Sequence, residues 1–415
     1  MTIETQPLTR QKVLQLDDAD PLAHCRERFD IPDGLLYFDG NSLGPLPHAS
    51  QQRLREVTEQ QWGQDLIRSW NTHRWIDLPR HTGAKIARLI GARDDEVIAA
   101  DSTSVNLFKL LDAACGLRPD RRVILTLADD FPTDRYIAAS VAERRGLELR
   151  AVPPPGLEAA LGPSVAVLVA SHVDYKTSAM LDLDRLTRRA HDVGALTLWD
   201  LSHSAGAVDL DLGRAGADLA IGCGYKYLNG GPGAPAFAFV RRELQTALET
   251  PLPGWLGHAE PFAFASAYEP GPGVDRLLCG TPPILSLASL DAALEAFDGV
   301  DLGEVRRKSM ALGSLFLDRL ENTWADHGLQ LASPDGAQQR GSHLALRHPQ
   351  GFAVMQALIE RRVIGDFRPP DLMRFGFAPL YHRYADVWDA VETLRDILSS
   401  GVFHEPRYAV RGTVT

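Results

Sequence analysis

The chain has 415 residues, with 43 Lys and Arg against 54 Asp and Glu, which gives a formal net charge of −11. Hydrophobic residues make up 45% of the chain, a share typical of folded globular proteins, so disordered and fibrous classes are excluded. A net acidic chain is also a poor candidate for binding nucleic acid or an anionic membrane surface, and we expect neither as a partner. Four dispersed cysteines without CxxC spacing favour reduced thiols over a disulfide scaffold or a metal site.

The first twenty residues show no targeting signal, because they lack an apolar stretch and end in acidic residues. The longest aliphatic run, over 165–170, is too short to span a bilayer. We therefore expect a cytoplasmic protein.

Short apolar runs alternate with amphipathic stretches between about Glu96 and Val240. The runs predicted to be strands cover residues 123–127, 147–152, 165–170, 195–199, 219–221 and 236–240. The helices predicted between them include 104–114, 133–145 and 182–193. This alternation predicts an α/β protein with a doubly wound, mainly parallel sheet, in which ligands bind at the carboxyl ends of the strands.

A loop rich in Pro and Gly over 251–283 indicates a boundary, and a long helical region is predicted from Ile284 to about Thr323. Beyond it, a strand over 342–347 and helices over 352–362 and 387–399 predict a smaller α+β domain. We expect an N-terminal arm over 1–50 that joins the small domain and the active site, a large domain over 51–283, and a linking helix with the small domain over 284–415.

Several common catalytic motifs are excluded. The run from Ser202 to Gly206 resembles the nucleophile elbow of serine hydrolases, but Ser202 replaces the glycine that the tight turn needs. The run from Gly222 to Gly224 begins like a dinucleotide-binding loop, but Tyr227 stands at the third glycine position. The sequence also contains no P-loop and no HExxH helix.

Polar side chains follow two of the predicted strands. Asp200 and His203 come after one apolar run, and Tyr225 and Lys226 lie in a Gly-rich loop after the next. Each feature alone has a plainer explanation, because an Asp after a strand is more often a turn or capping residue. A lone Lys is more often solvated, although the apolar strand before Lys226 argues against that.

Ser102 and Thr103 open a strongly apolar predicted helix, where hydroxyl and backbone N–H groups form a phosphate site or simply a helix cap. A phosphate site, an Asp and a Lys at strand ends are together the parts that a pyridoxal-phosphate enzyme needs. The Lys forms a Schiff base with the cofactor, and the Asp keeps the pyridine nitrogen protonated. Phe131 is placed to stack on the cofactor ring.

Several runs of the sequence closely resemble the kynureninase family, especially its bacterial members. They are 39–44 (Asp-Gly-Asn-Ser-Leu-Gly), 131–134, 172–177, 199–206 and 224–233, with shorter matches at 70–71, 254–258, 279–281 and 373–377. The resemblance covers the chain from about Leu35 to its C-terminus. It implies the aspartate-aminotransferase fold, pyridoxal phosphate as cofactor, and hydrolytic cleavage of L-kynurenine to anthranilate and L-alanine in tryptophan catabolism.

The resemblance also implies roles for single residues. Lys226 matches the lysine that carries the cofactor, Asp200 the partner of the pyridine nitrogen, and Phe131 the ring-stacking residue. Asp134 and His203 match further residues of the cofactor pocket. The positions around the phosphate are Ser102, Thr103, Tyr225, Trp255 and Thr281. In the family the last two come from the neighbouring subunit, so a homodimer with shared sites is implied.

On the substrate side, Arg374 matches the arginine that binds the α-carboxylate, a task suited to a guanidinium. Asn41, Ser42 and Trp70 match positions that surround the substrate, although Trp70 and Trp255 would equally suit a core or an interface. Tyr225 is the expected proton donor to the substrate Cβ. Thr281, where animal members carry Asn, is typical of the bacterial type, which favours kynurenine over its 3-hydroxy form.

Three other functions remain open. A cysteine desulfurase-like lyase needs a nucleophilic cysteine in the last third of the chain, and no cysteine follows Cys279. An aminotransferase would share the same fold and cofactor. A non-catalytic cofactor-binding homologue is disfavoured because Lys226, Asp200, Tyr225 and Arg374 are present together.

Overall fold

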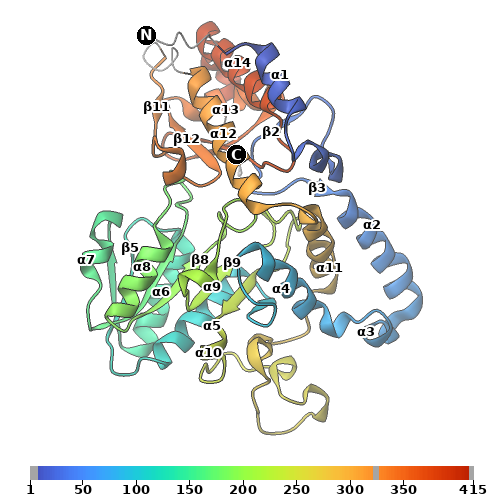
Figure 1. Cartoon of the computed structure of the whole chain (residues 1–415), viewed down its shortest axis with the longest axis vertical. Coiled ribbons are helices and arrows are strands. Elements are labelled where there is room, and N and C mark those ends of the chain that lie inside the picture. Colours follow the sequence, from blue (N-terminus) through green and yellow to red (C-terminus); the bar gives the residue numbers. More distant parts are fainter. Residues whose placement is uncertain (1–7, 321–326, 411–415) are drawn as a thin grey trace. The chain divides into compact units, whose positions relative to one another are not determined.

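The computed structural model describes residues 8–320 and 327–410 of the chain (Figure 1). The start of the predicted N-terminal arm, residues 1–7, and the predicted helix end at 321–323 lie outside the described residues. The chain divides into two compact units. The large unit is formed by Leu46–Tyr175 and Met180–Asp298, and the small unit by Met1–Pro45, Lys176–Ala179 and Gly299–Thr415. Each unit has its own hydrophobic core.

Within the described residues of the large unit, a sheet of seven strands has the order β4-β10-β9-β8-β7-β5-β6. The strands are β4 (Val97–Ala99), β5 (Val123–Leu127), β6 (Glu148–Val152), β7 (Val165–Ser171), β8 (Leu196–Asp200), β9 (Leu219–Gly222) and β10 (Phe237–Val240). Neighbouring strands from β9 to β6 pair in parallel, whereas β10 runs antiparallel to both β9 and β4. The predicted mainly parallel α/β sheet is therefore confirmed.

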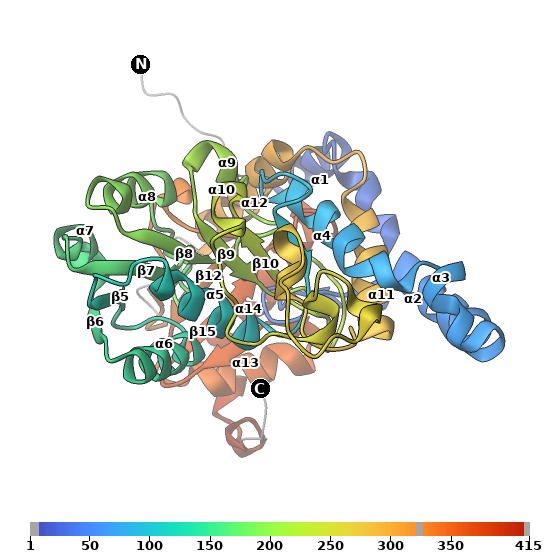
Figure 2. The same cartoon turned by 90° about the horizontal axis from the view of Figure 1, so that it is seen from below.

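Helices cover both faces of this sheet (Figure 2). On one face lie α5 (Thr103–Gly116) and α6 (Pro132–Arg145), and on the other lie α7 (Leu157–Ala160) and α8 (Leu183–Asp192). Leu107 and Leu110 of α5 are fully buried in the core that α5 shares with the sheet. Cover on both faces explains why the sequence of a central strand such as β7 is almost continuously apolar.

The remaining helices of the large unit are mostly short. They are α2 (His48–Glu56), the π-helix η2 (Val57–Asp65), α3 (Ser69–Thr72), α4 (Leu78–Leu89), α9 (Leu212–Ala215), α10 (Arg242–Gln245) and α11 (Ile284–Ala293). Helix α11 packs against α2 and α4, so it belongs to the large unit, whereas the sequence boundary at 283/284 places it with the small domain. The long helical region predicted from Ile284 is interrupted near Gly299, where φ is +73°.

In the described part of the small unit, four antiparallel strands have the order β11-β12-β15-β14. They are β11 (Gln330–Leu331), β12 (His343–Arg347), β14 (Asp366–Arg368) and β15 (Leu372–Gly376). Next to them, β2 (Leu36–Tyr37) pairs in parallel with β13 (Val363–Ile364). The helices that share the apolar core of this unit are α1 (Arg10–Asp18), α12 (Leu302–Leu320), α13 (Gly351–Glu360) and α14 (Tyr384–Ser400).

Candidate active site

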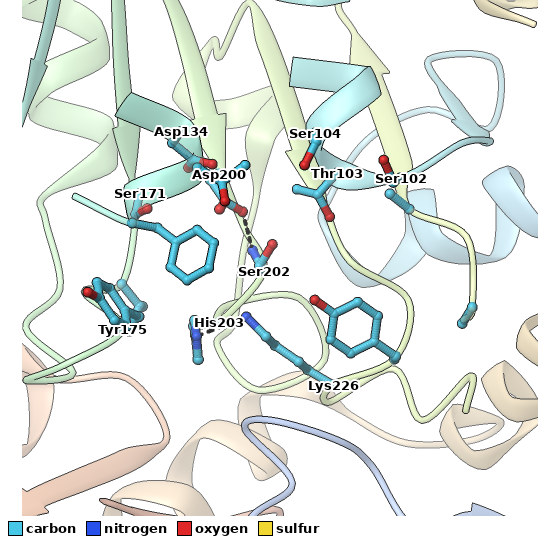
Figure 3. A pocket seen from close by; sticks show the side chains of 16 residues that line it. Ser102, Thr103, Ser104, Asp134, Ser171, Tyr175, Asp200, Ser202, His203 and Lys226 are labelled. Carbon is cyan, nitrogen blue, oxygen red and sulfur yellow. Dashed lines mark hydrogen bonds between the residues drawn. The ribbon is translucent and has the colours of Figure 1, made fainter. Parts of the chain in front are cut away.

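A cavity lies at the carboxyl edge of the large sheet, and the residues that line it belong to the large unit (Figure 3). Its walls are the starts of α5 and α6, the ends of β7 and β8, and the loop after β9. The predicted site residues that line it are Ser102, Thr103, Phe131, Asp134, Asp200, His203, Tyr225 and Lys226. The cavity therefore lies where ligands are expected in a parallel sheet, at the carboxyl ends of the strands.

Lys226 lies in the loop after β9, and its Nζ is 3.0 Å from Nε2 of His203. The two side chains point toward one another in Figure 3. The loop is tightly packed, because a Cβ atom at Gly224 would lie 2.4 Å from the carbonyl oxygen of Pro235. The glycine is therefore required for the close backbone approach that presents the lysine to the cavity.

Two carboxyl groups lie side by side at the sheet end of the cavity. Asp200 is the last residue of β8, and its Oδ1 accepts a hydrogen bond of 2.7 Å from the backbone N–H of Ser202. Asp134, in the first turn of α6, is buried and hydrogen-bonds to Asp200. Burial, together with the neighbouring Asp200 and Asp130 carboxylates, raises the pKa of Asp134 well above its usual value. Because burial and the neighbouring carboxylates disfavour its ionised form, Asp134 holds a proton near neutral pH.

The start of α5 forms another wall of the cavity. Ser102 is the N-cap, and its Oγ accepts a hydrogen bond of 3.3 Å from the backbone N–H of Val105. Thr103 and Ser104 follow in the first turn, and Figure 3 shows their hydroxyl groups near that of Ser102. The first N–H groups of a helix lack partners within the helix and carry partial positive charge, so this wall attracts an anion.

Three aromatic side chains, those of Phe131, Tyr175 and Tyr225, also line the cavity. The Phe131 side chain is 41% exposed, and its ring packs edge-on against Tyr175 with centroids 5.2 Å apart. Burial, together with the nearby Cys223 and Asp200, raises the pKa of the Tyr225 phenol above its usual value. Tyr225 therefore remains protonated at neutral pH and can donate a proton.

The chemistry of this donor set fits the predicted cofactor. The phosphate of pyridoxal phosphate suits the helix start at Ser102 and Thr103, and a protonated pyridine nitrogen suits the carboxyl pair of Asp134 and Asp200. The primary amine of Lys226 lines the same cavity, and a primary amine is the kind of group that forms a Schiff base with an aldehyde. Phe131 offers an apolar face to the ring.

In the small unit, Arg374 lies in the middle of β15 with only 2% of its surface exposed. Its Nε donates to Oδ1 of Asp366 at 2.7 Å, and its Nη2 also contacts Oδ2 of Asp366. Ser42 joins the group, since its Oγ accepts from Arg374 Nη2 at 3.2 Å and donates to Asp366 Oδ2 at 3.0 Å. Burial alone would raise the pKa of Asp366, but the pairs with Arg374 and Arg368 outweigh it and lower the pKa.

A second carboxyl group lies beside this cluster. Burial, together with the negative charge of Asp366, raises the pKa of Asp39 to about 7. Arg374, Arg368 and a hydrogen bond from Ser42 act in the opposite direction. Asp39 therefore changes its charge near neutral pH, next to the predicted carboxylate-binding arginine.

Asn41 is fully buried and packs against Gly376, where a Cβ atom would lie 2.1 Å from Asn41 Oδ1. Among the described residues, neither polar atom of its side-chain amide has a hydrogen-bond partner. An unsatisfied buried amide costs about 1–3 kcal/mol, so such a group in a folded protein is a candidate for contact with a ligand.

The other predicted residues of the large unit are not among those that line the cavity. Trp70, in α3, packs edge-on against Trp75 with centroids 6.0 Å apart. Trp255 is 36% exposed and stacks near Phe262 and Phe264, and Thr281 is exposed in the loop before α11.

Sequence reasoning missed two residues that organise these sites. Asp130 receives hydrogen bonds from the backbone N–H groups of Ser171 (3.0 Å) and Phe131 (2.8 Å), so it fixes the loop that carries Phe131. The sequence carries a signal for it, because Asp130 comes shortly after the apolar run 123–127, as Asp200 comes after the apolar run 195–199. The sequence around Asp366 gives no such signal, because Asp366 orients Arg374 only through the pairing of β14 with β15.

Two further features concern binding. In the part of the chain that the structure describes, no group of three or more His, Cys, Asp or Glu side chains is placed to hold a metal ion. No helix in the described ranges combines the length and apolar character needed to cross a membrane.

Comparison with solved structures shows a shared fold. A cysteine desulfurase from Thermococcus onnurineus NA1 matches over 91% of this chain and 98% of its own, with a TM-score of 0.77 at 18% identity. The cysteine desulfurase CsdA from Escherichia coli matches over the same shares, with a TM-score of 0.73 at 20% identity. At these identities the likeness establishes the fold alone.

Sequence comparison establishes the family. A kynureninase from Burkholderia mallei (strain SAVP1) is 50% identical over 414 residues, which cover 98% of this chain and 100% of the relative. A kynureninase from Pseudomonas fluorescens is 49% identical over the same shares. The family model described as kynureninase C-terminal domain matches residues 305–394. With half of its residues identical over nearly its whole length, the chain belongs to the kynureninase family.

Proposed function

We propose that this chain is a kynureninase, which uses pyridoxal phosphate to convert L-kynurenine and water to anthranilate and L-alanine. The observation that carries the proposal is the Lys226 amine, 3.0 Å from His203 in a cavity that also holds an anion-binding helix start and a buried carboxyl pair. When bound, pyridoxal phosphate withdraws electrons from the substrate Cα. The residues of the chain bind, orient and exchange protons around it.

Lys226 would hold the cofactor through its amine and would move a proton at the substrate Cα. Nε2 of His203 lies within hydrogen-bond distance of the Lys226 Nζ and holds the amine in the cavity. Asp200 would keep the ring nitrogen protonated, and Asp134 hydrogen-bonds to Asp200 as a neutral acid. Phe131 would stack on the ring, while Ser102 and Thr103 would bind the phosphate.

Tyr225 donates the proton that Cβ needs after the Cβ–Cγ bond breaks. Its position in the cavity supports this role, because its phenol is protonated at neutral pH and so has a proton to give. The water consumed supplies the hydroxyl group of the new anthranilate carboxyl. The alanine keeps the α-amine and α-carboxylate of the substrate.

Arg374 binds the substrate α-carboxylate, with Asn41 and Ser42 beside it. The buried cluster of Arg374, Asp366 and Ser42 supports this assignment, because a buried guanidinium that is already oriented loses little entropy when it binds an anion. The unsatisfied amide of Asn41 supports a second polar contact to the ligand. Trp70 supplies an aromatic wall for the substrate ring.

We propose that the protein acts as a homodimer in which Trp255 and Thr281 complete the phosphate site of the partner subunit. Two observations support this arrangement. Neither residue is among those that line the cavity of its own chain. Trp255 also gathers with Phe262 and Phe264 in an aromatic cluster whose members are 36%, 64% and 76% exposed, a pattern typical of an interface.

We also propose a cytoplasmic location and a role in tryptophan catabolism. The four cysteines are free thiols, three of them buried, as is usual in a reducing compartment. Thr281 favours kynurenine over 3-hydroxykynurenine. The ratio of kcat/KM for the two substrates tests this preference, and a higher value for the hydroxylated substrate would contradict it.

The direct test mixes the purified protein and pyridoxal phosphate with L-kynurenine and follows fluorescent anthranilate together with alanine. We expect the two products in equal amounts, and we expect Lys226→Ala to lose both turnover and the visible absorption of the cofactor–lysine bond. Full activity of that variant would refute the assignment. An aminotransferase would instead convert the cofactor to pyridoxamine phosphate with an amino acid alone.

A further inference from the structure

Helix α5 carries a buried lysine, Lys109, two turns after the helix start, and this residue is not among those that line the cavity. Lys109 is fully buried, and its Nζ donates to Oδ2 of Asp101 at 2.6 Å and to the carbonyl oxygen of Leu277 at 2.6 Å. A buried charge persists only when it is paired, so this ion pair is a built feature. The inference drawn from it rests on the cofactor site of the proposed function.

Asp101 occupies a critical position, because it directly precedes the N-cap Ser102 at the predicted phosphate site. Its φ of +52° lies in the left-handed region, which is unusual for residues other than Gly, Asn and Asp. The backbone carbonyl of Asp101 accepts from the N–H of Ala236 at 2.9 Å. Asn106 Nδ2 donates to the carbonyl of Ala100 at 2.7 Å. Side chains of α5 therefore hold the turn that leads into their own helix.

A carboxylate at position 101 can compete with a phosphate group for the N–H groups at the start of α5. Acidic side chains next to a helix start are attracted to its unpaired N–H groups and to the positive end of its dipole. The Asp101 side chain is 28% exposed, so it has room to move toward those groups. An unpaired carboxylate there would also repel a doubly charged phosphate ester.

We propose that Lys109 is a positioning residue for the cofactor phosphate. By pairing with Asp101, Lys109 neutralises the carboxylate that precedes α5 and holds it away from the helix start. The N–H groups of Ser102 and Thr103 are thereby left for the phosphate. Lys109 itself touches neither cofactor nor substrate and acts through Asp101.

The test measures cofactor binding by the apoprotein, so it does not depend on turnover. Pyridoxal phosphate and pyridoxal are titrated separately into wild type, Lys109→Met and the double variant Asp101→Asn/Lys109→Met, with Lys226 intact throughout. Both aldehydes bond to Lys226, and only one carries phosphate, so their affinity ratio isolates the phosphate site. In the double variant both charges are absent, and Asn readily adopts the left-handed conformation at position 101.

We expect Lys109→Met to bind pyridoxal phosphate at least about tenfold more weakly, with the affinity for pyridoxal nearly unchanged. The double variant should recover most of the loss, because the competing carboxylate has been removed. Equal losses for the two aldehydes would indicate general distortion and overturn the proposal, as would a double variant as weak as Lys109→Met. If Lys109→Met does not fold, Asp101→Asn alone decides, since a tenfold loss of pyridoxal phosphate affinity there would overturn the proposal. Failure of the wild type to bind pyridoxal phosphate would refute the proposed function instead.

Discussion

Arg374 and Asp366 are register partners on the neighbouring strands β15 and β14, and their side chains form a buried two-point ion pair. The pair uses the Nε–Nη2 edge of the guanidinium, and the geometry of the strands holds that edge in place. The arginine predicted to bind the substrate carboxylate therefore has an orientation that is already set.

Asp366→Asn should weaken substrate binding more than it slows the reaction. The amide keeps the shape of the carboxylate but cannot accept both guanidinium bonds as an anion, so Arg374 loses its fixed orientation. We expect KM for kynurenine to rise by about tenfold or more while kcat changes little. The matched control is Asp371→Asn, which alters the more exposed ion pair with Arg347 on the same sheet and should leave KM unchanged. An unchanged KM in Asp366→Asn would contradict this role.

Asp39 should make substrate binding sensitive to pH near neutrality. Because the pKa of Asp39 is raised to about 7, the group is mostly neutral at pH 6 and mostly ionised at pH 8. Ionisation adds a negative charge beside Arg374 and Asp366, so the affinity for the substrate carboxylate should fall as pH rises. We expect the KM of wild type to rise between pH 6 and 8 more than that of Asp39→Asn, measured in the same buffers. Asp33→Asn, an exposed change in the same segment, should follow the wild-type profile.

Asp134 and Asp200 should respond unequally to the loss of a carboxylate. The raised pKa of Asp134 makes it the neutral member of the pair, and an amide reproduces a neutral hydrogen-bonding acid. We therefore expect Asp134→Asn to keep kcat within about tenfold of wild type, and Asp200→Asn to lose about a hundredfold or more. The measurement is kcat of each variant, determined by steady-state kinetics at saturating cofactor. Equal losses would show that the charge is shared between them.

Tyr225→Phe should slow the chemistry without releasing the cofactor. The variant keeps the ring but removes the phenolic proton that we assign to Cβ, so kcat should fall by about a hundredfold or more. The visible absorption of the cofactor–lysine bond should persist, because Lys226 is intact. Tyr227→Phe, which alters a buried tyrosine two residues later in the chain, is the control and should retain kcat. A wild-type kcat in Tyr225→Phe would assign the proton to another group.

The strands that lead to the cavity could be predicted from the sequence, but the edge strand β4 and the direction of its neighbour β10 could not. Apolar runs located β5 to β10, but β4 has only three residues and gives no periodic signal. The reversed direction of β10 was also inaccessible, because strand direction depends on pairing across the sheet. Similarly, the break near Gly299 depends on a positive φ that composition does not reveal.

The site shows the same division. Lys226 and Asp200 could be proposed because each follows an apolar strand. Asp366 and Lys109 could not, since a charged residue in an apolar stretch becomes meaningful only when its buried partner is known. The roles of Arg374 and Trp255 came from family resemblance rather than from any local pattern.

The small unit joins the two ends of the chain, and this has a consequence for synthesis on the ribosome. β2 pairs with β13, and Ser42 donates to Asp366, a residue 324 positions later. The N-terminal segment therefore emerges first but must wait for nearly the whole chain before its partners exist. The residues of the large unit are complete by Asp298, well before that closure. A chain that stops short of β14 would contain Lys226 and the other residues that line its cavity but would lack both Asp366 and Arg374.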